Sequence, residues 1–152
     1  MRSAYKQIQF YKIRKQMDFY MKQKNNSKLA KEWFKIGEEE FKFAKSAFED
    51  FDAFYPQICF QCQQAAEKYL KGFLVFHQKK FPKVHDLVEL IKLCSKINKS
   101  FLKFSKKAAI LSQYYLRSRY PIEYPAATKE EARQSFQIAK EIIKFIKKVV
   151  PS

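Results

Sequence analysis

One stretch of the chain repeats apolar side chains with the period of an α-helix almost without a miss. The positions are Cys62, Ala65, Ala66, Tyr69, Leu70, Phe73 and Leu74, with His77 ending the stripe. Their spacing of i, i+3, i+4 and i+7 puts them on one face of a helix. The other face carries Gln61, Gln64, Glu67, Lys68 and Lys71. Such a continuous apolar stripe predicts a central helix, in which His77 is a partly buried structural residue.

Weaker patterns of the same kind predict a helix on either side of this one. Before it, apolar positions from Leu29 onward outline a helix that ends ahead of residues 54–56, where Phe-Tyr-Pro breaks the pattern. After it, the carboxylate of Asp86 can cap a third helix, and Glu89 follows three residues on.

A join that contains two prolines separates the last two predicted helices. Ser100 is the expected cap of the fourth helix. Its expected inward residues are Phe104, Ala108, Leu111 and Tyr115. The fourth helix must end by Tyr120, because Pro121 disfavours a helical conformation of the residue before it. The chain then runs extended past Pro125 until Thr128, where T-K-E-E is a capping box for a fifth helix.

These patterns indicate an all-α chain. It has only two glycines, and no segment alternates apolar and polar residues between turn dipeptides, so strands have little support. The 152 residues are enough for one domain with a single core. We expect residues 29–152 to form an up-down four-helix bundle with an additional C-terminal helix.

Residues 1–28 have a different composition and are predicted to be a basic extension of this domain. They hold eight basic residues and one acid, Asp18. Phe10, Ile13, Met17 and Tyr20 recur at helical spacing. The extension is therefore either disordered or an amphipathic helix, which would lie on the bundle, on RNA or on no partner.

The whole chain is strongly basic. Lys and Arg outnumber Asp and Glu by 31 to 15, a formal net charge of +16. This excess attracts phosphate-bearing partners, although AT-rich coding would also enrich a chain in Lys without selection for binding. No stretch approaches the roughly 18 apolar residues of a membrane span, and the N-terminus lacks the apolar region of a secretory signal. We therefore expect a cytoplasmic protein without a membrane partner.

The three cysteines argue against a disulfide framework. Cys59 and Cys62 form a C-x-x-C pair, and Cys94 is the third. An odd number of thiols fits a reducing compartment. Because Cys62 lies on the apolar stripe and no second close pair of ligands exists, we expect buried thiols and no metal or other cofactor.

Three segments together resemble the HEPN domain, the "higher eukaryotes and prokaryotes nucleotide-binding" family. They are CFQCQQAAEKYLKGFL (59–74), HDLVELI (85–91) and YYLRSRYP (114–121), the last followed by TKEEARQSFQIAKEIIKFI. The match covers about residues 29–148. The resemblance implies a helical homodimer, often encoded in prokaryotic operons beside a minimal nucleotidyltransferase, with which it commonly forms a toxin–antitoxin pair. Many HEPN domains are metal-independent ribonucleases.

The ribonuclease branch of the family uses an Arg that is followed four to six residues later by a His. Here no His follows Arg117 or Arg119, and Tyr124 stands five positions after Arg119. A phenol, with an ordinary pKa of about 10, is a poor general base at neutral pH, whereas an imidazole at about 6.5 suits the role. We therefore expect no confident catalytic residue, and Arg119 with Tyr124 remains an alternative. By analogy with the toxin branch, Tyr124 is also a candidate acceptor of a nucleotidyl group.

A binding site is the favoured interpretation of the proline-containing join. Arg119 offers a planar fork of donors to a phosphate, and Arg117 adds charge nearby. Tyr115 or Tyr120 could stack on a base or on a guanidinium.

The resemblance adds two lysines of the second helix to this site. If the fourth helix packs beside the second, as it implies, Lys68 and Lys71 would join the arginines in one basic groove. His85 is expected to anchor its loop by hydrogen bonds, and Asp86 to cap the helix that follows.

Structural alternatives stay open for several of these residues. Arg119 could cap the end of the fourth helix and pair with Glu123 or Glu67. Tyr114 and Tyr115 could be packing residues of a core or a dimer interface.

We therefore predict a homodimeric HEPN protein whose basic face binds a nucleotide or RNA phosphate, acting with a minimal nucleotidyltransferase. One alternative is a metal-independent ribonuclease toxin that uses Arg119 and Tyr124. The other is a purely structural dimerisation module.

Overall fold

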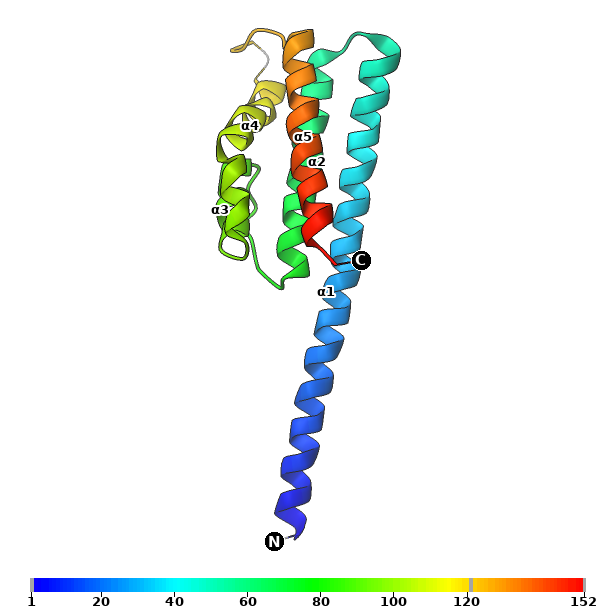
Figure 1. The fold of residues 1–152 in the computed structure, drawn as a ribbon, viewed down its shortest axis with the longest axis vertical. Helices are drawn as coiled ribbons and strands as arrows, with labels where there is room; N and C mark the ends of the chain where they lie inside the picture. The colour runs from blue at the N-terminus through cyan, green and yellow to red at the C-terminus, as the bar shows by residue number, and fades with distance from the viewer. Residues whose placement is uncertain (1, 121, 152) are drawn as a thin grey trace.

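The computed structural model describes residues 2–120 and 122–151, with side chains from residue 7 onward. This part of the chain forms five α-helices and one 3₁₀ helix (Figure 1). They are α1 Arg2–Phe51, α2 Tyr55–Phe76, α3 Leu87–Ser95, η1 Lys99–Phe104, α4 Ser105–Arg119 and α5 Lys129–Val149. Because residues 2–120 and 122–151 contain no strand, the predicted all-α class is confirmed.

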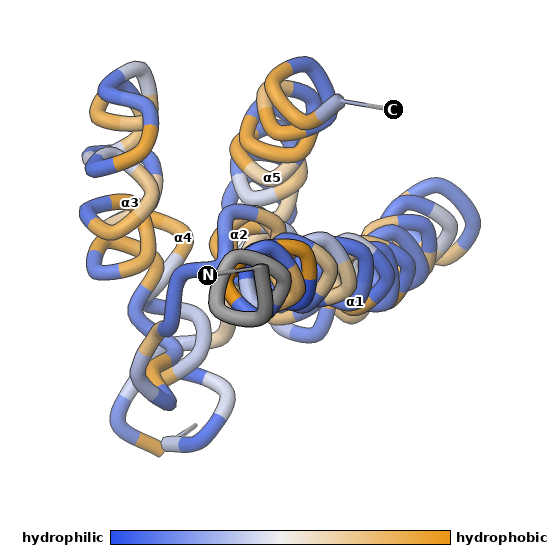
Figure 2. Tube along the Cα trace, turned by 90° about the horizontal axis from the view of Figure 1, so that it is seen from below, coloured by the Kyte–Doolittle hydropathy of each residue, from blue (hydrophilic) through white to orange (hydrophobic). Residues whose placement is uncertain are grey.

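Helix α2 lies at the centre of the molecule, with α1, α3, α4 and α5 packed around it (Figures 1 and 2). Its apolar stripe is fully covered: Ala65, Ala66, Leu70, Phe73 and Leu74 are at most 1% exposed. Helices α1, α2, α4 and α5 run alternately up and down, while the short α3 and η1 fill the connection between α2 and α4. The predicted up-down bundle is therefore confirmed.

Two helix starts follow the predicted capping chemistry. The Asp86 carboxylate accepts a hydrogen bond from the backbone N–H of Val88 at 2.9 Å, which begins α3. At the start of α5, the Thr128 hydroxyl accepts from the N–H of Glu131, whose carboxylate accepts from the N–H of Thr128. Both caps satisfy backbone donors that have no partner inside the helix.

Two predictions for the fourth helix are wrong. Asn98 accepts a hydrogen bond from the N–H of Ser100 and begins the separate segment η1, so α4 starts only at Ser105. The buried aromatic residue near the end of α4 is Tyr114, at 2% exposure, and Tyr115 is only partly buried at the edge of the bundle. Burial raises the pKa of the Tyr114 phenol to about 12.

Helix α1 is one continuous helix that includes the predicted basic extension. Residues 7–25 are exposed, and this half of α1 projects beyond the bundle (Figure 1).

Within the bundle, α1 and α2 approach closely at two glycines: a Cβ on Gly37 would lie 2.7 Å from the Tyr69 ring, and one on Gly72 would lie 2.6 Å from the Phe34 ring. A domain boundary at residue 28 stays a prediction. No helix in the described part of the chain is long and apolar enough to cross a membrane.

Candidate functional site

The two arginines near the end of α4 have different surroundings. The Arg117 guanidinium donates to Glu131 Oε1 at 2.8 Å and to the backbone carbonyl of Pro125 at 2.9 Å. Its side chain is only 11% exposed, and its hydrogen bond holds the pKa of the Glu131 carboxyl below its ordinary value. Arg117 therefore fastens α4 to the start of α5 and to the join, and most of its donors are already used.

Arg119 is exposed, and its guanidinium lies 5.0 Å from the centroid of the Tyr115 ring. Among the residues that the structure describes, no carboxylate forms an ion pair with Arg119. The alternative pairings with Glu123 and Glu67 are therefore wrong, and Glu67 instead contacts Lys71 and His85. Arg119 keeps its donors available to a ligand.

The Tyr115 ring also stacks on His85, which comes from the loop before α3. The two ring centroids are 4.0 Å apart and the ring planes are 14° from parallel. Arg119, Tyr115 and His85 therefore form one stacked group, which we call the Arg–Tyr–His cluster. It joins α4 to the loop before α3 and fixes the direction of all three side chains.

Glu67 of α2 anchors the His85 side of the cluster. Nδ1 of His85 lies 3.1 and 3.2 Å from the two oxygens of Glu67, and the backbone carbonyl of His85 accepts from Gln63 at 3.0 Å. Glu67 is 1% exposed, and its other partner is the ammonium of Lys71, with Nζ at 2.7 Å. Burial alone would raise the pKa of the Glu67 carboxyl, but the hydrogen bond and charge of Lys71 keep it below its ordinary value.

The expectation that Lys71 lies on an exposed basic face is wrong. It is 7% exposed, and its ammonium lies between Glu67 and the rings of Trp33 and Phe81, at 5.8 and 5.5 Å from their centroids. Helix α1 and the loop after α2 cover this side of α2, so the predicted polar face is partly core. Lys68 is half-buried and donates to Gln64 at 3.0 Å.

The remaining predicted residues lie on or near the join. Tyr120 and Tyr124 are exposed, and the aromatic ring that the Arg119 guanidinium lies over is that of Tyr115. Pro121 lies outside the described residues, and Pro125 contributes its carbonyl to Arg117.

A groove of about 510 Å³ runs beside the cluster, between the loop before α3 and α4. His85 and Tyr115 contribute to its wall, together with Ser112 and the apolar side chains of Val88 and Leu116. Its volume falls within the range of about 300 to 1,000 Å³ that is usual for small-molecule sites. Ser112 is not among the residues predicted from the sequence, and its Oγ accepts from the N–H of Leu87 at 3.0 Å.

The three cysteines lie in the core of the bundle. Cys59, Cys62 and Cys94 are buried, and burial raises the pKa of each thiol. The described residues contain no group of three or more His, Cys, Asp and Glu side chains that could hold a metal ion.

The chain is similar to known proteins in both sequence and fold. The model of the HEPN domain matches residues 30–149. The crystal structure of TT1696 from Thermus thermophilus has a TM-score of 0.67 at 25% identity, over 80% of this chain and 98% of that one. ST0689, an archaeal HEPN homologue, has a TM-score of 0.62 at 26% identity, over 78% of this chain and 95% of that one. No curated protein sequence matches significantly. The chain belongs to the HEPN domain family.

Proposed function

We propose that the protein binds a nucleotide or an RNA phosphate at the Arg–Tyr–His cluster. The observation that carries the proposal is the Arg119 guanidinium, which lies over an aromatic ring and is paired with no carboxylate among the described residues. A guanidinium held over a ring keeps its planar fork of N–H donors free for two parallel bonds to phosphate oxygens.

The groove beside the cluster suits the rest of a nucleotide. Val88, Ala109 and Leu116 give it an apolar surface for a base, and the Ser112 hydroxyl provides a polar group close by. The stacked rings of Tyr115 and His85 already hold the cluster in place, so less side-chain entropy is lost on binding.

Calorimetry with ATP, GTP and short RNAs tests this proposal. We expect Arg119→Ala to weaken binding by about 10- to 100-fold, since a hydrogen bond to a charged group contributes about 1.5–3 kcal/mol. Arg133→Ala is the matched control, because Arg133 is an exposed arginine that pairs with Glu130 at 2.5 Å. No binding by the wild-type protein, or equal losses in the two variants, would refute the proposal.

The cellular role that we propose follows from family membership. HEPN domains often form dimers, and the protein is proposed to act as a homodimer with a minimal nucleotidyltransferase in a toxin–antitoxin-like pair. Light scattering of the purified protein tests the homodimer. Co-expression with the product of a neighbouring nucleotidyltransferase gene, followed by purification on one tagged partner, tests the pair, and a failure to co-purify would count against it.

A ribonuclease is the second candidate, and the contact between Glu67 and His85 favours it. If Nδ1–H of His85 donates to Glu67, Nε2 is free to accept a proton from an RNA 2′-hydroxyl. Arg119, which contacts the same Tyr115 ring as His85, would then hold the phosphate. His85 thus replaces Tyr124 as the candidate base.

Cleavage of a labelled RNA in EDTA distinguishes the two bases. The ribonuclease candidate predicts loss of cleavage in His85→Asn, which can keep a hydrogen bond to Glu67, and normal cleavage in Tyr124→Phe. The reverse pattern would restore Tyr124 as the candidate base, and an inactive wild-type protein would leave binding as the function.

A further inference from the structure

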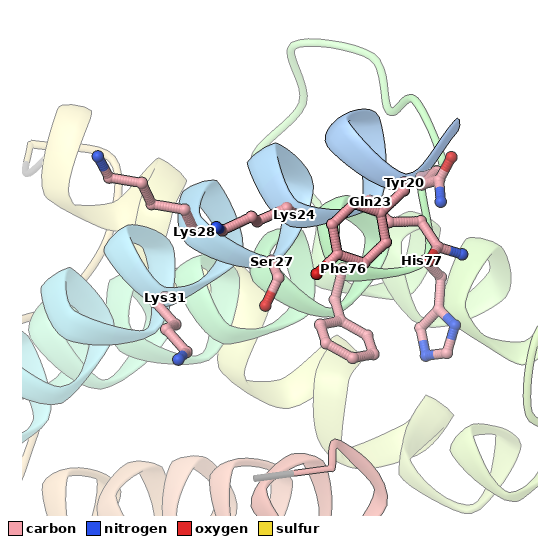
Figure 3. A pocket seen from close by; sticks show the side chains of 9 residues that line it. Tyr20, Gln23, Lys24, Ser27, Lys28, Lys31, Phe76 and His77 are labelled. Atoms are coloured by element: carbon pink, nitrogen blue, oxygen red, sulfur yellow. The ribbon is translucent and has the colours of Figure 1, made fainter. Parts of the chain in front are cut away.

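A second concave surface lies near the end of α2 (Figure 3). It is at the place where the projecting half of α1 leaves the bundle (Figure 1). It encloses about 710 Å³. Its lining includes Tyr20, Lys24, Lys28 and Lys31 of α1, with Phe76 at the end of α2 and His77 directly after it. We call it the α1–α2 notch.

Three lysines give the notch a concentrated positive charge. Lys24, Lys28 and Lys31 stand at positions i, i+4 and i+7, so their ammonium groups share one side of α1. No carboxylate lines the notch, and in the described part of the chain none forms an ion pair with these lysines. Like charges at this spacing on a helix repel each other, so an anion bound among them would relieve this repulsion.

The opposite side of the notch is aromatic. Figure 3 shows the rings of Tyr20, Phe76 and His77 at one end and the lysines at the other. Tyr20 is 63% exposed, and the His77 ring contacts Phe73 and Phe76 at centroid distances of 4.5 and 5.2 Å. Burial lowers the pKa of His77, with a smaller effect of the Lys79 charge in the same direction. At neutral pH its ring is therefore an uncharged face, and the lysines supply the charge.

We propose that the α1–α2 notch binds a single-stranded nucleic acid, with phosphates on the three lysines and a base against the aromatic rings. From Lys24 to Lys31 the helix rises about 10 Å, which suits successive phosphates along a strand better than one phosphate group. Aromatic faces beside a basic surface bind single strands with little sequence preference.

Other occupants fit this surface less well. Ile8 and Phe19 lie on the opposite side of α1 from Ile13 and Met17, because 100° per residue separates the two pairs by almost half a turn. Phe10, Ile13, Met17 and Tyr20 recur on one side, but apolar side chains also stand on the other. The projecting helix is therefore not divided into one apolar and one polar face, as a helix on a membrane surface is. A second copy of the helix would bring two strongly basic segments together, which repel each other.

Fluorescence anisotropy with a labelled single-stranded RNA of about 12 nucleotides tests the proposal. The test variant is Lys24→Gln/Lys28→Gln/Lys31→Gln. The control is Lys12→Gln/Lys15→Gln/Lys22→Gln, which removes the same charge from the other side of the same helix. We expect the test variant to bind at least about tenfold more weakly than the control, with a salt slope smaller by about 2 because three phosphate contacts at about 0.7 each are lost.

Several results would overturn the proposal. Equal weakening in the two triple variants would mean that only net charge matters. Binding to anionic lipid vesicles that depends on the same lysines, with no binding to RNA, would assign the notch to a membrane surface. Unchanged RNA affinity in Tyr20→Leu would refute the part of the proposal in which a base stacks on the aromatic rings.

The notch proposal does not depend on the proposed function at Arg119. In an Arg119→Ala background the notch substitutions should still cost about tenfold in RNA affinity, whereas mononucleotide binding should survive the notch substitutions alone. If the notch substitutions no longer weaken RNA binding in this background, the notch proposal fails. If Arg119→Ala leaves mononucleotide binding unchanged, the proposed function at Arg119 fails.

Discussion

Replacing Lys71 by Met tests whether the core of the site is a buried ion pair. Glu67 is 1% exposed, and the Lys71 ammonium lies 2.7 Å from its carboxylate. Removing one partner of a buried pair costs about 3–5 kcal/mol, because the other charge is left without compensation. His85 and Gln63 still contact Glu67 in the variant, so we expect the lower part of this range, about 3–4 kcal/mol.

Urea unfolding followed by circular dichroism at pH 7 measures this loss. With a slope of about 2 kcal/mol per molar urea, the middle of the usual range, the midpoint should fall by roughly 1.5–2 M. Lys68→Met is the control, because Lys68 is half-buried and its ammonium bonds only to the uncharged Gln64. The double variant Glu67→Gln/Lys71→Met should regain part of the lost stability, since no buried charge then remains.

The same variant has a predictable pH dependence. In the wild-type protein the pKa of the Glu67 carboxyl is lowered. The ion pair with Lys71 therefore contributes its full stability above the ordinary pKa of a glutamate, and this stability is lost as pH falls through the folded-state pKa of Glu67. The gap between the wild-type protein and Lys71→Met should therefore narrow in acid. If Lys71→Met costs no more than Lys68→Met at pH 7, or if it weakens nucleotide binding without a loss of stability, the ion-pair interpretation is refuted.

Three further substitutions test other parts of the structure. Arg117→Ala should cost about 1–3 kcal/mol in urea unfolding, because it breaks the bonds to Glu131 and to the join; a loss confined to ligand affinity would contradict this. Gly72→Ala should lower the melting temperature, since the new Cβ would lie 2.6 Å from the Phe34 ring. This clash should outweigh the helix propensity of alanine, which is about 1 kcal/mol more favourable than that of glycine; a higher melting temperature would show that the ring moves freely. Glu40→Gln should raise the urea midpoint at pH 7 but not at pH 4. Burial raises the pKa of the Glu40 carboxyl, whose Oε2 has no hydrogen-bond partner, so its protonated form stabilises the fold below the ordinary pKa of a glutamate and this stability is lost as pH rises through the folded-state pKa. An unchanged midpoint at pH 7 would refute this.

The parts of the fold that depend on local chemistry could be predicted from the sequence. The stripe of α2 and the caps at Asp86 and Thr128 each depend on residues within one or two turns. The inward face of α4 could not be predicted in the same way. Positions 114 and 115 both continue the spacing after Leu111, and the choice of Tyr114 depends on where α4 packs against its neighbours.

The candidate site could be predicted only in part, for a related reason. The exposed Arg119 at the end of α4 follows from Pro121, which ends the helix. The burial of Lys71 does not follow from periodicity, because its coverage comes from Trp33 and Phe81, which are distant in sequence. The contact between Glu67 and His85 likewise joins residues 18 positions apart.

The distribution of charge shows why the two proposed anion sites should behave differently. Within the bundle many basic residues are paired with carboxylates, as Lys71, Arg117 and Lys129 are. Residues 1–28 have eight basic residues and one acid, a net +7 of the total +16, in a helix that projects from the bundle. Binding at the α1–α2 notch should therefore weaken steeply with salt, because many counterions are released there. Binding at Arg119, which depends on one directed pair of hydrogen bonds, should change much less over the same range of salt.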